Sequence, residues 1–72
     1  MFQATKFLDC EFESPEQMRS ILRSYGFPAL SRDAIYKVRM RDNLSAKWLA
    51  LLLCVLELER GRPVSVIPYI KH

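Results

Sequence analysis

The sequence predicts a mainly α-helical domain with three helices and short β-strands near both ends. Two observations predict the helices: a serine that can act as an N-cap precedes each of three helix-forming segments, and glycine follows two of them. The segments outside them alternate between apolar and polar residues or contain proline, which favours short strands. With 72 residues, 50% hydrophobic and 26% charged, the chain has the size and composition of a single globular domain.

The first expected element is a β-strand over residues 8–12. The order Leu-Asp-Cys-Glu-Phe alternates apolar and polar residues, which is typical of a half-buried strand. Asp9, Glu11 and Glu13 would then lie on one face of that strand. We interpret this face as solvent-exposed, because carboxylates are rarely buried without a partner.

The first helix is expected from Pro15 to about Ser24. Ser14 can cap it, and Gln17 can complete a capping box. Gly26 then suits the left-handed position that ends a helix. One apolar face is predicted by the spacing of Met18, Ile21, Leu22 and Tyr25.

The second helix is expected to begin after Ser31 and to run to about Arg41. Ser31 can cap it, and Asp33 lies in the first turn, where a negative charge is favourable. This helix would have a charged outer face and a narrow apolar stripe on its inner face. That inner stripe is predicted to consist of Ala34, Ile35 and Val38.

The third helix is expected from Ala46 to about Arg60, with Ser45 as its cap and Gly61 at its end. It is apolar on nearly all sides, whereas a surface helix of a small domain usually buries only one stripe. Self-association is the simplest way to cover the excess, so the sequence predicts a homodimer. The predicted interface residues are Trp48, Leu52 and Val55.

The segment that follows, residues 62–70, contains Pro63 and Pro68. Proline cannot donate a backbone hydrogen bond, so this segment is expected to form a short edge strand at most. It would pair with residues 8–12 or with its own copy in another subunit.

The net charge of +3 is unevenly distributed along the chain. Residues 1–18 carry a net charge of −3, residues 19–47 carry +5, and the remainder carries +1. A basic segment of this kind suits phosphate or an acidic protein surface as a partner.

Metal-binding and enzymatic functions are not expected. Cys10 and Cys54 lie far apart and the only histidine is His72, whereas zinc needs four clustered ligands. We interpret the cysteines as two buried free thiols, with a disulfide between them as the less favoured alternative. No nucleophile has a neighbouring base and there is no glycine-rich phosphate loop, so no cofactor is expected.

A membrane location is not expected either. The apolar run over residues 48–56 is far shorter than the roughly 20 residues that cross a bilayer. The amino-terminal residues also lack the pattern of a signal peptide. The sequence therefore predicts a soluble cytoplasmic protein.

Residues 31–39, with the sequence Ser-Arg-Asp-Ala-Ile-Tyr-Lys-Val-Arg, resemble the recognition helix of Cro-type helix-turn-helix regulators of phages and prophages. Such helices show a capping Ser or Thr, a polar pair, a small residue, a branched apolar residue, and another apolar residue three positions later. The resemblance covers about residues 15–58. The chain differs from the usual pattern at Tyr25, where a small residue is common, and at Ala29, where the turn usually has glycine.

The resemblance implies a three-helix, helix-turn-helix-like domain that binds double-stranded DNA. It places four side chains toward base edges in the major groove, namely Arg32, Asp33, Tyr36 and Lys37. It assigns phosphate contacts to Arg19, Arg23, Ser31, Arg39, Arg41 and Lys47.

Two functions are therefore open from the sequence. The first is a small DNA-binding transcriptional regulator of a phage or prophage that reads DNA with the helix over residues 31–41. The second is a phage-encoded protein-interaction module that binds and inhibits a host protein on a helix-turn-helix-like scaffold. An exposed apolar helix and the aromatic residues Tyr25, Phe27 and Trp48 would suit the second.

Overall fold

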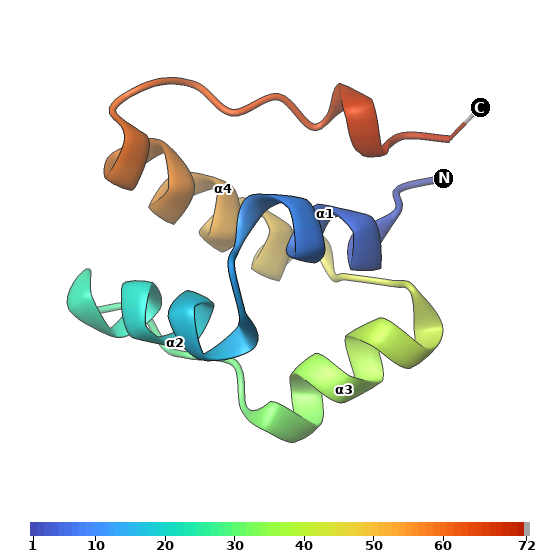
Figure 1. Cartoon of the computed structure of the whole chain (residues 1–72), viewed down its shortest axis with the longest axis horizontal. Coiled ribbons are helices and arrows are strands. Elements are labelled where there is room, and N and C mark those ends of the chain that lie inside the picture. Colours follow the sequence, from blue (N-terminus) through green and yellow to red (C-terminus); the bar gives the residue numbers. More distant parts are fainter. Residues whose placement is uncertain (72) are drawn as a thin grey trace.

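The computed structural model describes residues 1–71, and His72 lies outside the described residues. The chain forms four α-helices and a short 3-10 helix (Figure 1). These elements are α1 (Ala4–Glu11), α2 (Pro15–Ser24), α3 (Arg32–Arg41), α4 (Ala46–Arg60) and η1 (Ile67–Tyr69). The mainly helical class is confirmed, and α2, α3 and α4 have the bounds that the sequence predicts.

Serine caps begin the three predicted helices, as expected from the sequence. Each hydroxyl oxygen accepts a hydrogen bond from the backbone N–H three residues later, which satisfies one donor of the first turn. The distances are 3.1 Å from Gln17 N to Ser14 Oγ, 3.1 Å from Ala34 N to Ser31 Oγ and 3.3 Å from Trp48 N to Ser45 Oγ.

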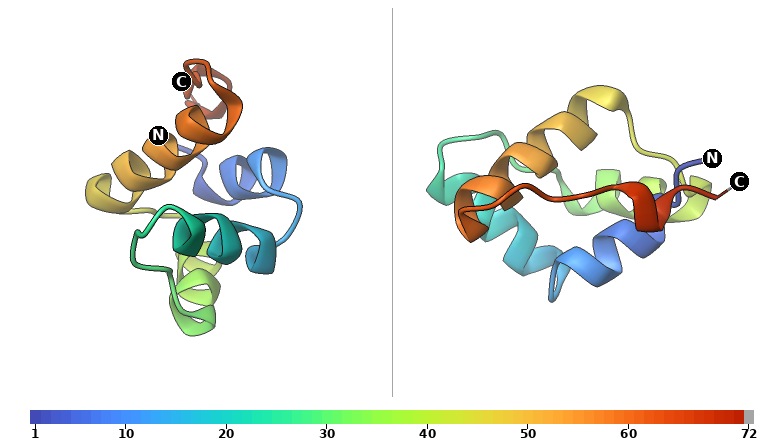
Figure 2. Two further views of the ribbon diagram at one scale, coloured as in Figure 1. Left: turned by 90° about the vertical axis from the view of Figure 1, so that its left-hand side faces the viewer. Right: turned by 90° about the horizontal axis from the view of Figure 1, so that it is seen from above.

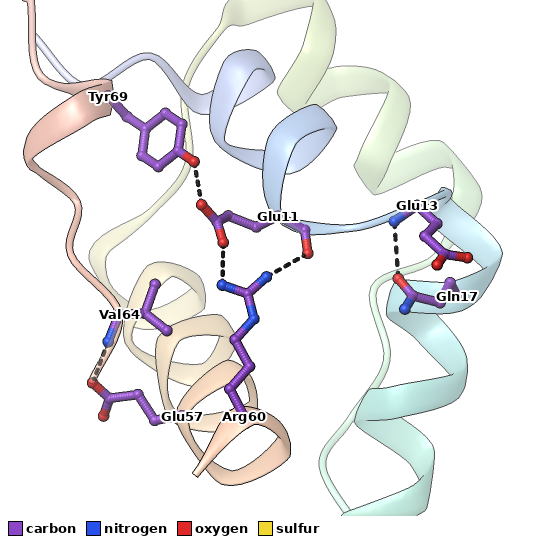
Figure 3. Close-up of polar contacts among 7 residues, drawn as sticks. All are labelled: Glu11, Glu13, Gln17, Glu57, Arg60, Val64 and Tyr69. Carbon is purple, nitrogen blue, oxygen red and sulfur yellow. Dashed lines mark hydrogen bonds and ion pairs between the residues drawn. The ribbon is translucent and has the colours of Figure 1, made fainter. Parts of the chain in front are cut away.

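The ends of α2 and α4 also follow the sequence. Gly26 and Gly61 adopt left-handed backbone angles, with φ of 78° and 67°. The capping box of α2 differs in one detail. The side chain of Gln17 accepts the hydrogen bond from the N–H of Glu13 at 3.0 Å, one residue before the cap (Figure 3).

The predicted strand over residues 8–12 is wrong, because most of this segment belongs to helix α1. Phe7 and Leu8 are buried together with Ala4, at the spacing of a helix, while Cys10 is exposed. Phe12 is also buried, but it lies just past the helix in extended backbone. The alternation of Leu8, Cys10 and Phe12 therefore does not reflect a strand. Leu8 is buried as part of a helix, and Phe12 is buried in the extended backbone that follows it.

A side chain that is distant in the sequence caps α1. Gln3 makes no side-chain cap, and the N–H of Thr5 donates instead to Oδ1 of Asp42 at 2.9 Å. Asp42 is the residue that ends α3, in left-handed backbone with φ of 48°. The Thr5 hydroxyl also approaches the carbonyl oxygen of Arg39 at 3.5 Å. These contacts join the start of α1 to the end of α3.

The four helices pack around one core. Helix α1 contacts α3 on one side and η1 on the other, and α2 packs against α4. In Figure 1, α1 crosses in front of α4, and in Figure 1 and the left view of Figure 2, α3 lies at one end of the molecule. The largest fully buried side chains come from three helices and are Phe7, Met18, Leu22, Leu52 and Val55.

The predicted C-terminal strand is also wrong, and the backbone of this segment pairs with a different part of the chain from the one expected. Residues 1–71 contain no β-sheet, only an isolated antiparallel bridge between Phe2 and Ile70. Beside it, the N–H of Gln3 donates to the carbonyl of Tyr69 at 2.6 Å. The backbone of the chain after α4 thus pairs with the N-terminal segment, residues 1–3, rather than with residues 8–12 (Figure 1).

Glu11 connects this returning segment to α1 and α4. Arg60 donates to its carboxylate at 2.5 Å and to its backbone carbonyl at 3.1 Å, and the Tyr69 hydroxyl donates to the other carboxylate oxygen (Figure 3). Burial raises the pKa of Glu11, but the hydrogen bonds from Tyr69 and Arg60 and the charges of Arg60 and Arg62 outweigh it, so the pKa lies below 4.5. Burial and the bond to Glu11 raise the pKa of Tyr69.

This lowered pKa gives an expected pH dependence of stability. Because the folded-state pKa of Glu11 lies below 4.5, ionised Glu11 stabilises the fold above that pH, and the contribution is lost as the pH falls through the folded-state pKa. Urea unfolding of Glu11→Gln should therefore show a shallower loss of stability below about pH 5 than the wild type. Glu13→Gln, which changes an exposed carboxylate, should follow the wild type. If Glu11→Gln lost stability below about pH 5 as steeply as the wild type, the stabilising role of ionised Glu11 would be contradicted.

Candidate nucleic-acid interface

The four side chains assigned to base edges lie on the exposed face of α3. Its inner stripe is as expected, with Ile35 buried and Ala34 and Val38 half-buried. Helix α3 contacts α1 and lies at one end of the molecule, most clearly in the left view of Figure 2. The exposed residues of the outer face are Arg32, Asp33, Tyr36, Lys37 and Met40.

Two cations of this face form ion pairs within the chain. Arg32 Nε lies 3.0 Å from Glu16 Oε1 of α2, and Lys37 Nζ lies 3.2 Å from Asp33 Oδ2 one turn earlier in α3. All four side chains are more than half exposed, so each pair contributes little to stability. These ion pairs keep Arg32 and Lys37 near carboxylates, so DNA would have to compete with the carboxylates for the two cations.

Arg39 and Arg19, both assigned to phosphates, are less accessible than that assignment assumes. Arg39 Nη2 lies 2.5 Å from Asp9 Oδ1 of α1, and this pair helps to hold α3 against α1. Arg19 has a side chain only 19% exposed and lies 3.6 Å from Glu16. Arg39 thus joins α3 to α1, whereas Arg19 pairs with a carboxylate of its own helix.

The other four predicted phosphate contacts are exposed. Arg23, Arg41 and Lys47 have no carboxylate within ion-pair distance among residues 1–71. They lie at the end of α2, the end of α3 and the start of α4. Ser31 accepts the capping hydrogen bond with its oxygen, which leaves its hydroxyl proton able to donate to a phosphate.

A groove runs between the start of α2 and α3. Its volume is about 400 Å³, and it is open to solvent. Three of the side chains that line it are apolar or aromatic, and three are charged. They are Pro15, Ile35 and Tyr36, with Glu16, Arg32 and Arg39.

The predicted dimer interface on α4 needs correction. Leu52 and Val55 are fully buried within the chain, because α4 packs against α2 and both residues lie in a core to which α1 and α2 also contribute. Trp48 is half-buried against the same core. The exposed apolar stripe of α4 consists instead of Ala50, Cys54 and Leu58, spaced four residues apart.

The cysteines are free, but the expectation that they are buried is wrong. Cys10 and Cys54 are both exposed, on α1 and α4 respectively. Within residues 1–71, no three His, Cys, Asp or Glu side chains are grouped so that they could hold a metal ion.

Sequence reasoning missed the acidic partners of the basic segment. Asp9 and Glu16 each hold an arginine that was assigned to DNA. The signal was present in the charge distribution, because residues 1–18 carry −3 and residues 19–47 carry +5. Two segments of opposite charge in one small domain favour each other as partners.

None of the helices within the described part of the chain has the length and apolar character needed to span a bilayer. Comparison of the chain with models of protein families, with curated proteins and with solved structures gave no match.

Proposed function

We propose that this chain is a small DNA-binding transcriptional regulator of a phage or prophage, with a helix-turn-helix-like domain that reads DNA with α3. The observation that carries the proposal is the placement of α3: it is capped, it stands at one end of the fold, and its polar face is exposed. A helix presented in this way fits the major groove of B-DNA.

One local feature differs from the usual motif. The connection from α2 to α3 extends from Tyr25 to Ser31, longer than the three or four residues typical of a helix-turn-helix. Helix α3 is instead held by α1, through the Asp9–Arg39 pair and the Asp42 cap. In this proposal α1 therefore supports the recognition helix.

Salt-dependent DNA binding tests the proposal. Three exposed cations without an internal carboxylate, Arg23, Arg41 and Lys47, would neutralise about three phosphates per chain. The logarithm of the affinity for random duplex should then fall against the logarithm of the salt concentration with a slope of roughly −2.7 per chain. Arg41→Ala or Lys47→Ala should each reduce the slope by about 0.9.

Arg62→Ala is the matched control for these variants. It removes the same charge from an exposed residue of the returning segment, which lies on the opposite side of the fold from α3 (Figure 1). Its slope should equal that of the wild type. No binding of the wild type at ~50 mM salt, where the electrostatic attraction is strongest, would overturn the regulator proposal.

The groove beside α3 favours the second candidate, a phage-encoded module that binds and inhibits a host protein. Tyr36 lies at this groove with 60% of its surface exposed, and aromatic residues are frequent anchors of protein interfaces. The test is capture of a host protein from a lysate treated with nuclease. Capture of one host protein by the wild type but not by Tyr36→Ala, together with no DNA binding, would favour this function.

We also propose that the chain forms a homodimer through the exposed stripe of α4. If two copies pack their α4 helices antiparallel about a two-fold axis near Cys54, the small Ala50 of one copy faces the large Leu58 of the other. Lys47 of each copy then lies near the negative C-terminal end of the partner's α4. Shape and charge are therefore both self-complementary.

Mild oxidation tests this dimer. The two Cys54 thiols would face each other, so a disulfide-linked species of twice the chain mass should form readily. Cys54→Ser should prevent the link, and Cys10→Ser, which changes the other exposed thiol, on α1, should not. Light scattering that gives only the monomer mass at micromolar concentration would contradict the dimer.

A further inference from the structure

We infer that Arg32 reads a guanine and that Glu16 positions its guanidinium for that contact. The inference rests on the proposed DNA-binding function and adds to it the identity of one base and a positioning residue on α2. Neither the sequence pattern of α3 nor its charge assigns a role to Glu16.

The orientation of Arg32 is the first observation. Its side chain is 76% exposed at the first position of α3, and its Nε atom is 3.0 Å from Glu16 Oε1. The carboxylate therefore meets the Nε edge of the guanidinium. Glu16 is the only carboxylate partner of Arg32 among residues 1–71. A fork of two parallel N–H donors matches O6 and N7 of guanine in the major groove.

The second observation is that Glu16 also pairs with an arginine of its own helix. Its other carboxylate oxygen, Oε2, lies 3.6 Å from Nη1 of Arg19, whose side chain is only 19% exposed. One oxygen thus faces an arginine of its own helix and the other faces Arg32. A long exposed side chain that is already oriented loses less conformational entropy when it binds.

The charge of Glu16 favours a base over a phosphate as the DNA group that Arg32 contacts. A phosphate that approached Arg32 would be repelled by the carboxylate 3.0 Å from Nε, and part of the arginine's charge is already neutralised. The acceptor edge of guanine carries no net charge and meets no such repulsion. Glu16 therefore lowers the affinity for random DNA and raises the preference for one base.

Base preference in four proteins tests the inference: the wild type, Arg32→Ala, Glu16→Ala and Glu13→Ala. Glu13 is the matched control, because it is an exposed carboxylate near the start of α2 without an ion pair among residues 1–71. Selection from a library of duplexes would identify the site that the wild type prefers. The affinity of each of the four proteins for this site and for its single-base variants would then be measured at one salt concentration. Circular dichroism would confirm that each variant is folded.

Replacing one guanine of the site should weaken wild-type binding on the order of 5- to 150-fold. Arg32→Ala should abolish the preference at that position. Glu16→Ala should weaken the preference at the same position and strengthen binding to random duplex. Glu13→Ala should leave the preference unchanged.

Two results would overturn the inference while leaving the regulator proposal in place. One is DNA binding in which no guanine preference depends on Arg32. The other is a Glu16→Ala variant that keeps the base preference of Glu13→Ala. Absence of DNA binding in the wild type would instead overturn the proposed function, and the inference with it.

Discussion

Leu52→Asp should unfold the domain rather than dissociate a dimer. Leu52 is fully buried in the core, so the substitution removes a buried leucine and places a carboxylate among apolar side chains. The expected loss is several kcal/mol, comparable with the whole stability of roughly 4–11 kcal/mol for a chain of this size. Circular dichroism and urea unfolding would measure it.

Leu58→Asp is the matched control on the same helix. Leu58 is 54% exposed, so the charge stays in water and the free energy of unfolding of the monomer should change by less than about 1 kcal/mol. If the proposed dimer forms, this variant should be folded and monomeric by light scattering. A folded, stable Leu52→Asp protein would show that the packing of α4 described above is wrong.

Phe7→Ala should destabilise the fold by about 3–5 kcal/mol, the usual cost of removing a buried phenylalanine. Phe7 is fully buried, and its ring centroid lies 5.5 Å from that of Phe2, 5.4 Å from Tyr69 and 6.4 Å from Phe12. Its loss would leave a cavity where the N-terminal and C-terminal segments meet. The shift of the urea midpoint measures the effect.

Cys10→Asp distinguishes the helix from the strand at this segment. In helix α1 the Cys10 side chain is exposed, so the substitution should change the free energy of unfolding by about 0.5 kcal/mol or less. In the strand that the alternation predicts, Cys10 would face the core beside Leu8 and the charge would be as costly as the loss of Phe7. A large effect at Cys10 with a small one at Phe7 would contradict α1.

The sequence by itself determined α2, α3 and α4, because their ends are specified by nearby residues. Each begins at a serine whose hydroxyl accepts a hydrogen bond three residues later, and α2 and α4 end at a left-handed glycine. The exposed face of α3 also followed from the sequence, since helical spacing alone placed Ile35 inside and Tyr36 outside. Such signals act within one or two turns and need no knowledge of the rest of the chain.

Only the tertiary structure decided α1, the burial of α4 and the environment of the basic residues. Helix α1 has no side-chain cap of its own, and the carboxylate of Asp42, 37 residues away, supplies the acceptor at Thr5 N. The same helix contributes Phe7 and Leu8 to the core that buries Leu52, and it carries Asp9, which holds Arg39. These contacts depend on which segments meet in space. Local propensity does not encode that choice. The opposite charges of residues 1–18 and 19–47 favour pairing between these segments, but the packing of the whole core selects the individual partners.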